Sequence, residues 1–187
     1  MKLSGLLGAV IWAVAGSAAL AASASSLAIS QPDLKGSARL DVSSPKITSG
    51  GNVPDTYSSY GEGVSPPLKW SSGPRNTQSF VLILEDPDAP LPEPFTHWLV
   101  WNIAPATTGV AQGAAPAGAQ QGMLLTGKVG YMGPRPPPGP AHHYHFEVFA
   151  LDRKLDLKSG ADRSALLAAM KGNVLASGEL VALYRKP

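Results

Sequence analysis

The 187-residue chain contains no cysteine. The domain must therefore be stabilised by its core without disulfides, and structural zinc sites built from thiolates are excluded. Charged residues are also scarce, at 15% of the chain, and the formal net charge is +2 at pH 7. A chain with so little charge has no basic patch of the kind that nucleic acid requires, so nucleic acid is not an expected partner.

Long hydrophobic runs are few as well. Residues 1–21 combine Lys2, a short apolar core and the sequence Ala19-Leu20-Ala21, which together are the features of a cleaved secretory signal peptide. An N-terminal membrane anchor is the alternative, but the apolar run is short for spanning. No later stretch is long enough to cross a bilayer, so the mature protein is expected to have no transmembrane span. The expected location is periplasmic or secreted.

Glycine and proline are abundant, with 20 and 18 residues, while 44% of the chain is apolar. This composition favours a loop-rich β protein with a real core over a helical or disordered chain. We expect a flexible N-terminal tether at residues 22–37, followed by one domain at residues 38–187.

Within the domain, several apolar stretches predict strands. Residues 79–85 (SFVLILE) and 97–103 (HWLVWNI) are apolar on both faces, which indicates central strands. Residues 38–42, 142–151 and 178–184 predict further strands, and residues 162–171 predict the one good helix, with Gly172 as its C-terminal cap. Strands without alternating helices favour antiparallel pairing.

Two stretches share one plan. Residues 84–102 read LEDPDAPLPEPFTHWLVWN, and residues 133–149 read GPRPPPGPAHHYHFEVF. Each is a proline-rich turn that leads into a histidine and an apolar strand, and we expect the two to meet as one small pocket. Proline loses little further entropy on ordering, so such loops suit a preformed site. Ala89-Pro90 is a candidate cis bond, because only X–Pro bonds adopt cis at an appreciable frequency.

The polar side chains in these stretches are candidate binding residues. Asp86 and Asp88 flank Pro87, and strand alternation would aim both carboxylates the same way, where each perturbs the pKa of the other. A histidine held by an aspartate has a fixed tautomer and presents its other nitrogen to a ligand, which favours His97 and His142. The plainer alternatives are that Asp86 accepts turn N–H groups and that each histidine is an ordinary strand-end residue.

The pattern supports metal and catalytic sites less well. Zinc accepts nitrogen and oxygen ligands, but the chain has no H-x-x-x-H pair, and the H-x-H pair His143 and His145 is expected on a solvent-facing side of its strand. No G-x-S-x-G sequence of a serine hydrolase occurs. We therefore predict no metal, no cofactor and no catalytic residue, with an acid- and histidine-dependent hydrolase as an alternative.

Five pieces of the chain together resemble a known family. They read GVSPPLKW (63–70), SFVLILEDPDAP (79–90), HWLVWNI (97–103), GPRPPPGPAHHYHFEVFAL (133–151) and ELVALYRK (179–186). In these pieces the chain is similar to the phosphatidylethanolamine-binding protein family, and within it to the bacterial Raf-kinase-inhibitor-like branch. The likeness covers nearly all of the mature chain.

The resemblance implies a mainly β fold, an antiparallel β-sandwich with a large central sheet, a few short peripheral helices and an anion-accepting pocket at one end. The residues that match the family's site by motif are Asp86, Asp88, His97, Pro138, Gly139, His142 and Tyr144.

The function implied is that of an exported binding protein for a small anionic ligand, such as a phosphate ester or a phospholipid head group. His97 and His142 would donate hydrogen bonds to the anion, and the two aspartates would orient them. An alternative is an inhibitor or modulator of an envelope protease or another protein partner, docked through the tether at residues 22–31.

One position departs from the family's pattern. The family usually has arginine between the histidine and tyrosine of its second motif, and this chain has His143. Arginine is always charged and can fork onto a carboxylate, whereas histidine is mostly neutral at pH 7. If that arginine stabilises the acidic loop, His143 would take over this role at low pH, when its ring is protonated. Alternatively, Arg135 would supply the missing positive charge.

Overall fold

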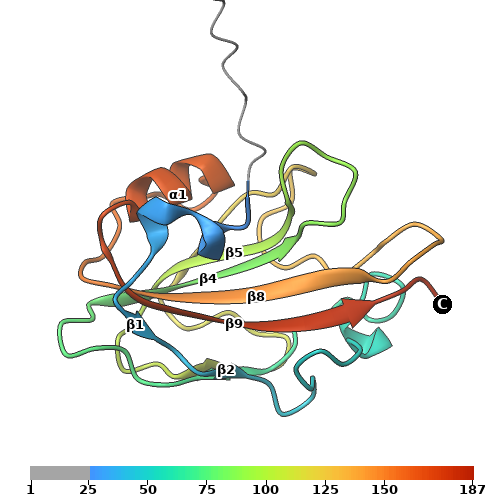
Figure 1. The fold of residues 1–187 in the computed structure, drawn as a ribbon, viewed down its shortest axis with the longest axis horizontal. Helices are drawn as coiled ribbons and strands as arrows, with labels where there is room; N and C mark the ends of the chain where they lie inside the picture. Colours follow the sequence, from blue (N-terminus) through green and yellow to red (C-terminus); the bar gives the residue numbers. More distant parts are fainter. Residues whose placement is uncertain (1–25) are drawn as a thin grey trace, which may run out of the picture.

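The computed structural model describes residues 26–187, which form two packed β-sheets with one α-helix on the outer face of the larger sheet (Figure 1). The larger sheet has six strands in the order β1-β9-β8-β4-β5-β7, and the smaller has three in the order β2-β3-β6. All pairs are antiparallel except the short pair of β1 with β9. The predicted class, a mainly β sandwich with a large central sheet, is confirmed.

The strands are β1 (Ala38–Arg39), β2 (Val42–Ser43), β3 (Leu68–Trp70), β4 (Ser79–Asp86), β5 (Phe95–Ile103), β6 (Gly109–Val110), β7 (Gln120–Gln121), β8 (His142–Leu151) and β9 (Val174–Tyr184). The helices are α1 (Arg163–Met170) and the short 3-10 helices η1 (Ala28–Ser30), η2 (Pro32–Leu34) and η3 (Asp55–Tyr57). The predicted strand at 38–42 is thus two short strands, β1 and β2, which join different sheets.

The central strands are buried on both faces, as their apolar runs predict. All eight residues of β4 are buried, and β4 lies between β5 and β8. One face of the large sheet packs on the small sheet, with Trp98 and Phe146 in that core, and the opposite face packs on α1 and the N-terminal segment, with Trp101 and Phe149. Trp98 and Trp101 are therefore core residues.

The predicted helix is present and begins and ends as its sequence indicates. Asp162 caps α1 by accepting a hydrogen bond from the Ala165 main chain at 2.9 Å. Leu166 and Met170 are fully buried against the sheet. Gly172 follows the helix with φ at 71°, a left-handed conformation that glycine adopts without strain.

The flexible tether predicted at residues 22–37 is wrong for its described part, residues 26–37. This segment forms η1 and η2 and lies across the outer face of the large sheet (Figure 1), with Ala28 and Leu34 fully buried. The segment is held on the sheet because the Ala28 main-chain N–H donates to the Glu85 carboxylate and the Ile29 main-chain N–H donates to the Glu147 carboxylate. The ordered domain therefore extends N-terminal of residue 38, and the predicted signal peptide lies outside the described residues.

Two further expectations are settled by the fold. The side of β8 that carries His143, His145 and Glu147 is only partly solvent-facing: His143 is exposed, whereas Glu147 is fully buried beneath the N-terminal segment. Ala89-Pro90 is trans, as are all peptide bonds in the described chain. No helix within residues 26–187 is long and apolar enough to cross a membrane.

Candidate anion-binding site

The two proline-rich stretches meet where β4 ends and β8 begins. These strands are antiparallel neighbours, so the last residue of β4, Asp86, lies beside the first residue of β8, His142. His142 Nδ1 donates to the Asp86 carboxylate at 2.8 Å, and the two side chains are only 12% and 5% exposed. The contact fixes the imidazole so that its Nε2 is left for a ligand.

His97 lies in the same region but is held differently. Its Nδ1 donates to the Met132 carbonyl at 2.9 Å, and its ring meets that of Tyr144 edge-on with centroids 5.2 Å apart. Burial lowers the pKa of His97, so its ring is neutral. A neutral imidazole with hydrogen on Nδ1 has an accepting Nε2. In this state the Nε2 of His97 is an acceptor, so donation from His97 to an anion stays a prediction that requires the ring to gain a proton.

Tyr144 has a hydroxyl without a well-formed hydrogen bond. The side chain is fully buried, and within the described residues no partner has good hydrogen-bond geometry at its Oη, although the Asp86 carboxylate is close enough to interact with it. Burial, and then the nearby Asp86 carboxylate, raise the pKa of Tyr144 far above its usual value. The hydroxyl therefore keeps its proton and is available as a donor. A buried donor without an acceptor costs about 1–3 kcal/mol, so such groups call for an explanation.

Asp88 stabilises the loop through contacts with His143. Its Oδ2 accepts hydrogen bonds from the His143 main-chain N–H at 2.7 Å and from His143 Nδ1 at 2.8 Å. Burial raises the pKa of Asp88, but the two bonds from His143 outweigh it, so the pKa lies below its usual value. The two aspartates thus contact different histidines, Asp86 the ring of His142 and Asp88 that of His143, and His143 makes the contact that arginine was considered to make at this position.

Replacing His143 by alanine is expected to destabilise the protein by about 0.5 kcal/mol or less at pH 7, because the pair is 53% and 40% exposed. In His143→Ala the main-chain N–H of residue 143 still donates to Asp88. In His143→Arg the side chain is also a donor, and it is charged at every pH tested. The pKa of Asp88 is lower in the folded protein than in the unfolded chain, so its ionisation stabilises the fold at pH values above the pKa of the unfolded chain. This contribution is lost as the pH falls through the pKa of the folded protein. Urea unfolding of the three proteins at pH 7 and about pH 4 checks this; a loss above about 2 kcal/mol for His143→Ala contradicts it.

The proline loop has an exposed part and a buried part. Pro138 and Gly139 are exposed, and their place at the rim of the pocket stays a prediction, whereas Pro134 and Pro136 are buried. The carbonyl of Pro134 accepts from the Ser59 main chain, and that of Pro136 accepts from the hydroxyl of Tyr60. The buried prolines therefore fasten the loop to the residues that follow η3.

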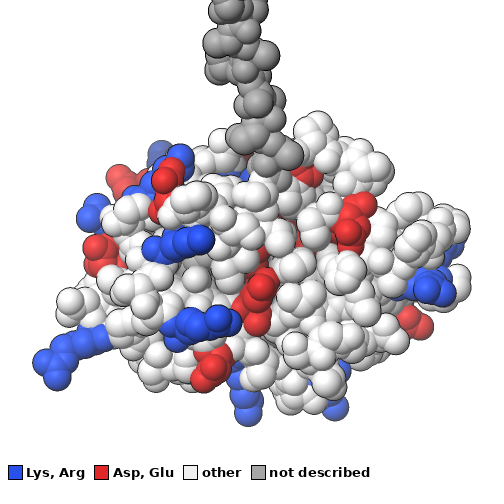
Figure 2. Space-filling view, in the orientation of Figure 1, with Lys and Arg blue, Asp and Glu red and all other residues white. Residues whose placement is uncertain are grey.

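Of two cations near the site, sequence reasoning named Arg135 only as a possible brace of the acidic loop, and it missed Lys186. Tyr184 is the register partner of His142, and its ring stacks on that of Tyr60 with centroids 6.3 Å apart. Arg135 and Lys186 each lie over the Tyr60 ring, 5.8 Å from its centroid. Figure 2 shows basic side chains at the edge of the molecule where the chain ends. Arg135 thus contacts an aromatic ring, and the only signal in the sequence was the run of cations at residues 185–186.

Comparison with known proteins identifies the family of this chain. The family model for phosphatidylethanolamine-binding proteins matches residues 43–185. A UPF0098 protein of Methanothermobacter thermautotrophicus is 43% identical over 141 residues, which cover 73% of this chain and 92% of that protein. The chain belongs to the phosphatidylethanolamine-binding protein family, whose members are generally binding proteins.

Solved structures support the same assignment. A Chlamydia trachomatis homologue of phosphatidylethanolamine-binding proteins is 38% identical, with a TM-score of 0.75 over 81% of this chain and all of the other. YbcL of E. coli, described as a member of the mammalian family, is 31% identical, also with a TM-score of 0.75, over 80% of this chain and all of YbcL.

Proposed function

We propose that this chain is an exported binding protein for a small phosphate-type anion, such as a phosphate ester or a phospholipid head group. The observation that carries the proposal is the buried hydroxyl of Tyr144, which lacks a well-formed hydrogen bond, beside the Asp86–His142 pair. Export rests on the signal-peptide features of residues 1–21.

The donors and acceptors of the site suit a phosphate that carries one proton. Tyr144 donates its O–H and His142 donates from Nε2, while neutral His97 accepts the phosphate's own O–H. Asp86 holds the His142 ring at 2.8 Å. Arg135 and Lys186 raise the local concentration of anions, an effect that salt screens.

Binding is favoured over hydrolysis. The hydroxyl nearest the two histidines belongs to Tyr144, and its raised pKa makes it a poor nucleophile. The alternative of an inhibitor docked through the N-terminal tether has lost its main support, because residues 26–34 are bound to the sheet.

Replacing Tyr144 by phenylalanine tests the proposal with two readouts of opposite sign. The free energy of unfolding is expected to stay the same or rise by up to about 1 kcal/mol, because a buried hydroxyl without a well-formed hydrogen bond is removed. Affinity for O-phosphorylethanolamine, measured by titration calorimetry, is expected to fall about 5- to 10-fold, since one hydrogen bond is lost. Tyr131→Phe is the matched control, because that hydroxyl already donates to the Tyr57 carbonyl. Unchanged affinity in Tyr144→Phe would count against the site.

A further inference from the structure

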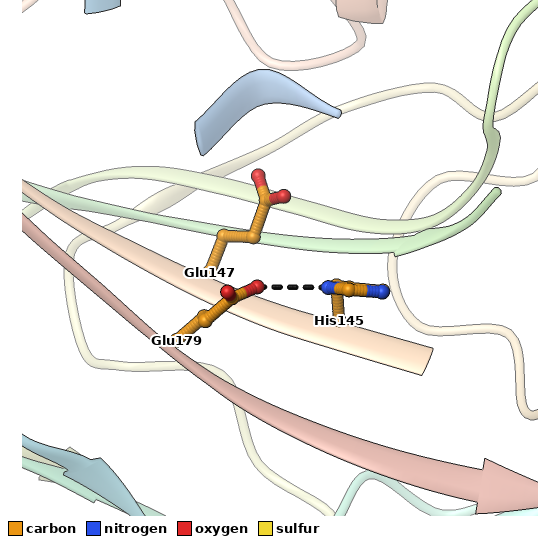
Figure 3. Close-up of side chains that lie close together, drawn as sticks. All are labelled: His145, Glu147 and Glu179. Carbon is orange, nitrogen blue, oxygen red and sulfur yellow. Dashed lines mark hydrogen bonds and ion pairs between the residues drawn. The ribbon is translucent and has the colours of Figure 1, made fainter. Parts of the chain in front are cut away.

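A second polar cluster lies on the opposite face of the large sheet. Alternation along β8 places His145 and Glu147 on the side away from His142 and Tyr144. Glu147 is the register partner of Glu179 on β9. His145 Nδ1 lies 2.8 Å from Glu179 Oε2, and Figure 3 shows all three side chains rising from the same face. One ligand atom from each residue lies within 4.8 Å of the others, and this is the one such histidine and acid group in residues 26–187.

Glu147 supplies an observation that points to a ligand. The residue is fully buried, and its Oε2 accepts from the Ile29 main chain at 3.2 Å. Its Oε1 is buried as well and has no hydrogen-bond partner within the described residues. Burial, and then the neighbouring Glu85 and Glu179 carboxylates, raise the pKa of Glu147 well above its usual value, so this site favours a proton or a cation beside the carboxylate. A bound cation satisfies Oε1.

Acidic groups outnumber basic ones around the cluster. Glu85, also on this face, is fully buried and is paired with Arg163 through Nε and through Nη2, and it accepts from the Ala28 main chain. Arg163 also acts electrostatically on Glu147, and His145 is the basic group that contacts Glu179. Two carboxylates beside one imidazole, with Glu147 fully buried, suit a divalent cation.

We propose that His145, Glu147 and Glu179 bind a divalent transition-metal ion of the zinc type, through the His145 Nδ1, the Glu147 Oε1 and one Glu179 oxygen. A nitrogen ligand with two carboxylate oxygens suits zinc, whereas magnesium and calcium prefer oxygen alone. Ligand atoms around tetrahedral zinc lie about 3.3 Å apart, given bonds of about 2.0–2.1 Å, so small side-chain rotations bring the three into place.

The arrangement gives the site an entry path and a coupling to the N-terminal segment. Glu179 is 34% exposed and His145 is 15% exposed, so the ion enters from their side. Figure 2 shows acidic side chains over the middle of this face. The ion replaces the proton that Nδ1 shares with Glu179, so binding releases a proton. Because Glu147 also holds Ile29, an ion on Oε1 stabilises the attachment of η1.

Zinc titration of the purified full domain tests the proposal, with calorimetry and Co²⁺ absorption as readouts. We expect one zinc per chain and an unfolding temperature that rises with zinc concentration. His145→Ala and Glu179→Gln are each expected to weaken zinc binding by about 100-fold or more, since loss of a supporting contact alone costs 10- to 100-fold.

Matched controls separate this site from other surface ligands. The chain has four histidines, so His143→Ala controls for His145→Ala, and exposed Glu62→Gln controls for Glu179→Gln. Both controls are expected to bind zinc as the parent does, and circular dichroism checks that every variant is folded. No saturable binding at micromolar zinc, or binding that survives in His145→Ala and Glu179→Gln, would overturn the proposal. The outcome is independent of phosphate binding, because Tyr144 faces the other side of the sheet.

Discussion

Replacing Glu85 by alanine is expected to lower the free energy of unfolding by about 3 kcal/mol or more. Glu85 is fully buried, and it pairs with Arg163, whose side chain is only 11% exposed. Removing one partner of a buried pair leaves the other charge poorly compensated, which typically costs about 3–5 kcal/mol. The substitution also removes the acceptor of the Ala28 main-chain N–H.

Urea unfolding measures this effect, and Glu93→Ala is its control. Glu93 also lies near Arg163, at 3.6 Å, but its side chain is 60% exposed, so its loss is expected to cost less than about 1 kcal/mol. Hydrogen exchange should show that the Ala28 amide loses protection in Glu85→Ala alone. Equal and small losses in both variants would contradict the role assigned to Glu85 in holding the N-terminal segment.

Replacing His142 by alanine is expected to weaken phosphate binding by about 10- to 100-fold. Hydrogen bonds to charged groups contribute about 1.5–3 kcal/mol, and the phosphate that His142 would contact is charged. The loss of stability should be smaller than in Glu85→Ala, because Asp86 still accepts from the Asp88 main chain at 2.9 Å.

Titration with O-phosphorylethanolamine gives the affinity, and His143→Ala is the matched control. The two histidines are adjacent, but His143 is 53% exposed and braces Asp88. Affinity should change less than about twofold in the control, since that contact is a surface ion pair. If His142→Ala binds the ligand as tightly as the parent protein does, His142 is not part of the binding site.

Local patterns in the sequence predicted the central strands, their antiparallel pairing and the meeting of the two motifs, while the sandwich architecture was predicted from the family resemblance. Apolar runs mark β4 and β5 as central strands, and antiparallel pairing of β4 with β8 brings Asp86 to His142. The roles of single atoms do not follow in this way. Whether His97 donates or accepts depends on the Met132 carbonyl, which lies 35 residues further along the chain.

The N-terminal segment shows the same limit. Residues 26–37 lack any periodic apolar pattern, so nothing local distinguishes them from a tether. They are ordered because Glu85 and Glu147, distant in sequence, accept their main-chain N–H groups. Covering that face also buries Glu147, which alternation alone places on an open surface.

The most direct test of the central claim is a crystal structure of the protein with O-phosphorylethanolamine. The account predicts the phosphate within hydrogen-bond distance, about 2.5–3.0 Å, of the Tyr144 hydroxyl and of His142 Nε2. It also predicts a phosphate oxygen at His97 Nε2, with the Asp86–His142 contact kept. A phosphate bound elsewhere, or none at that position at saturating ligand, would contradict it.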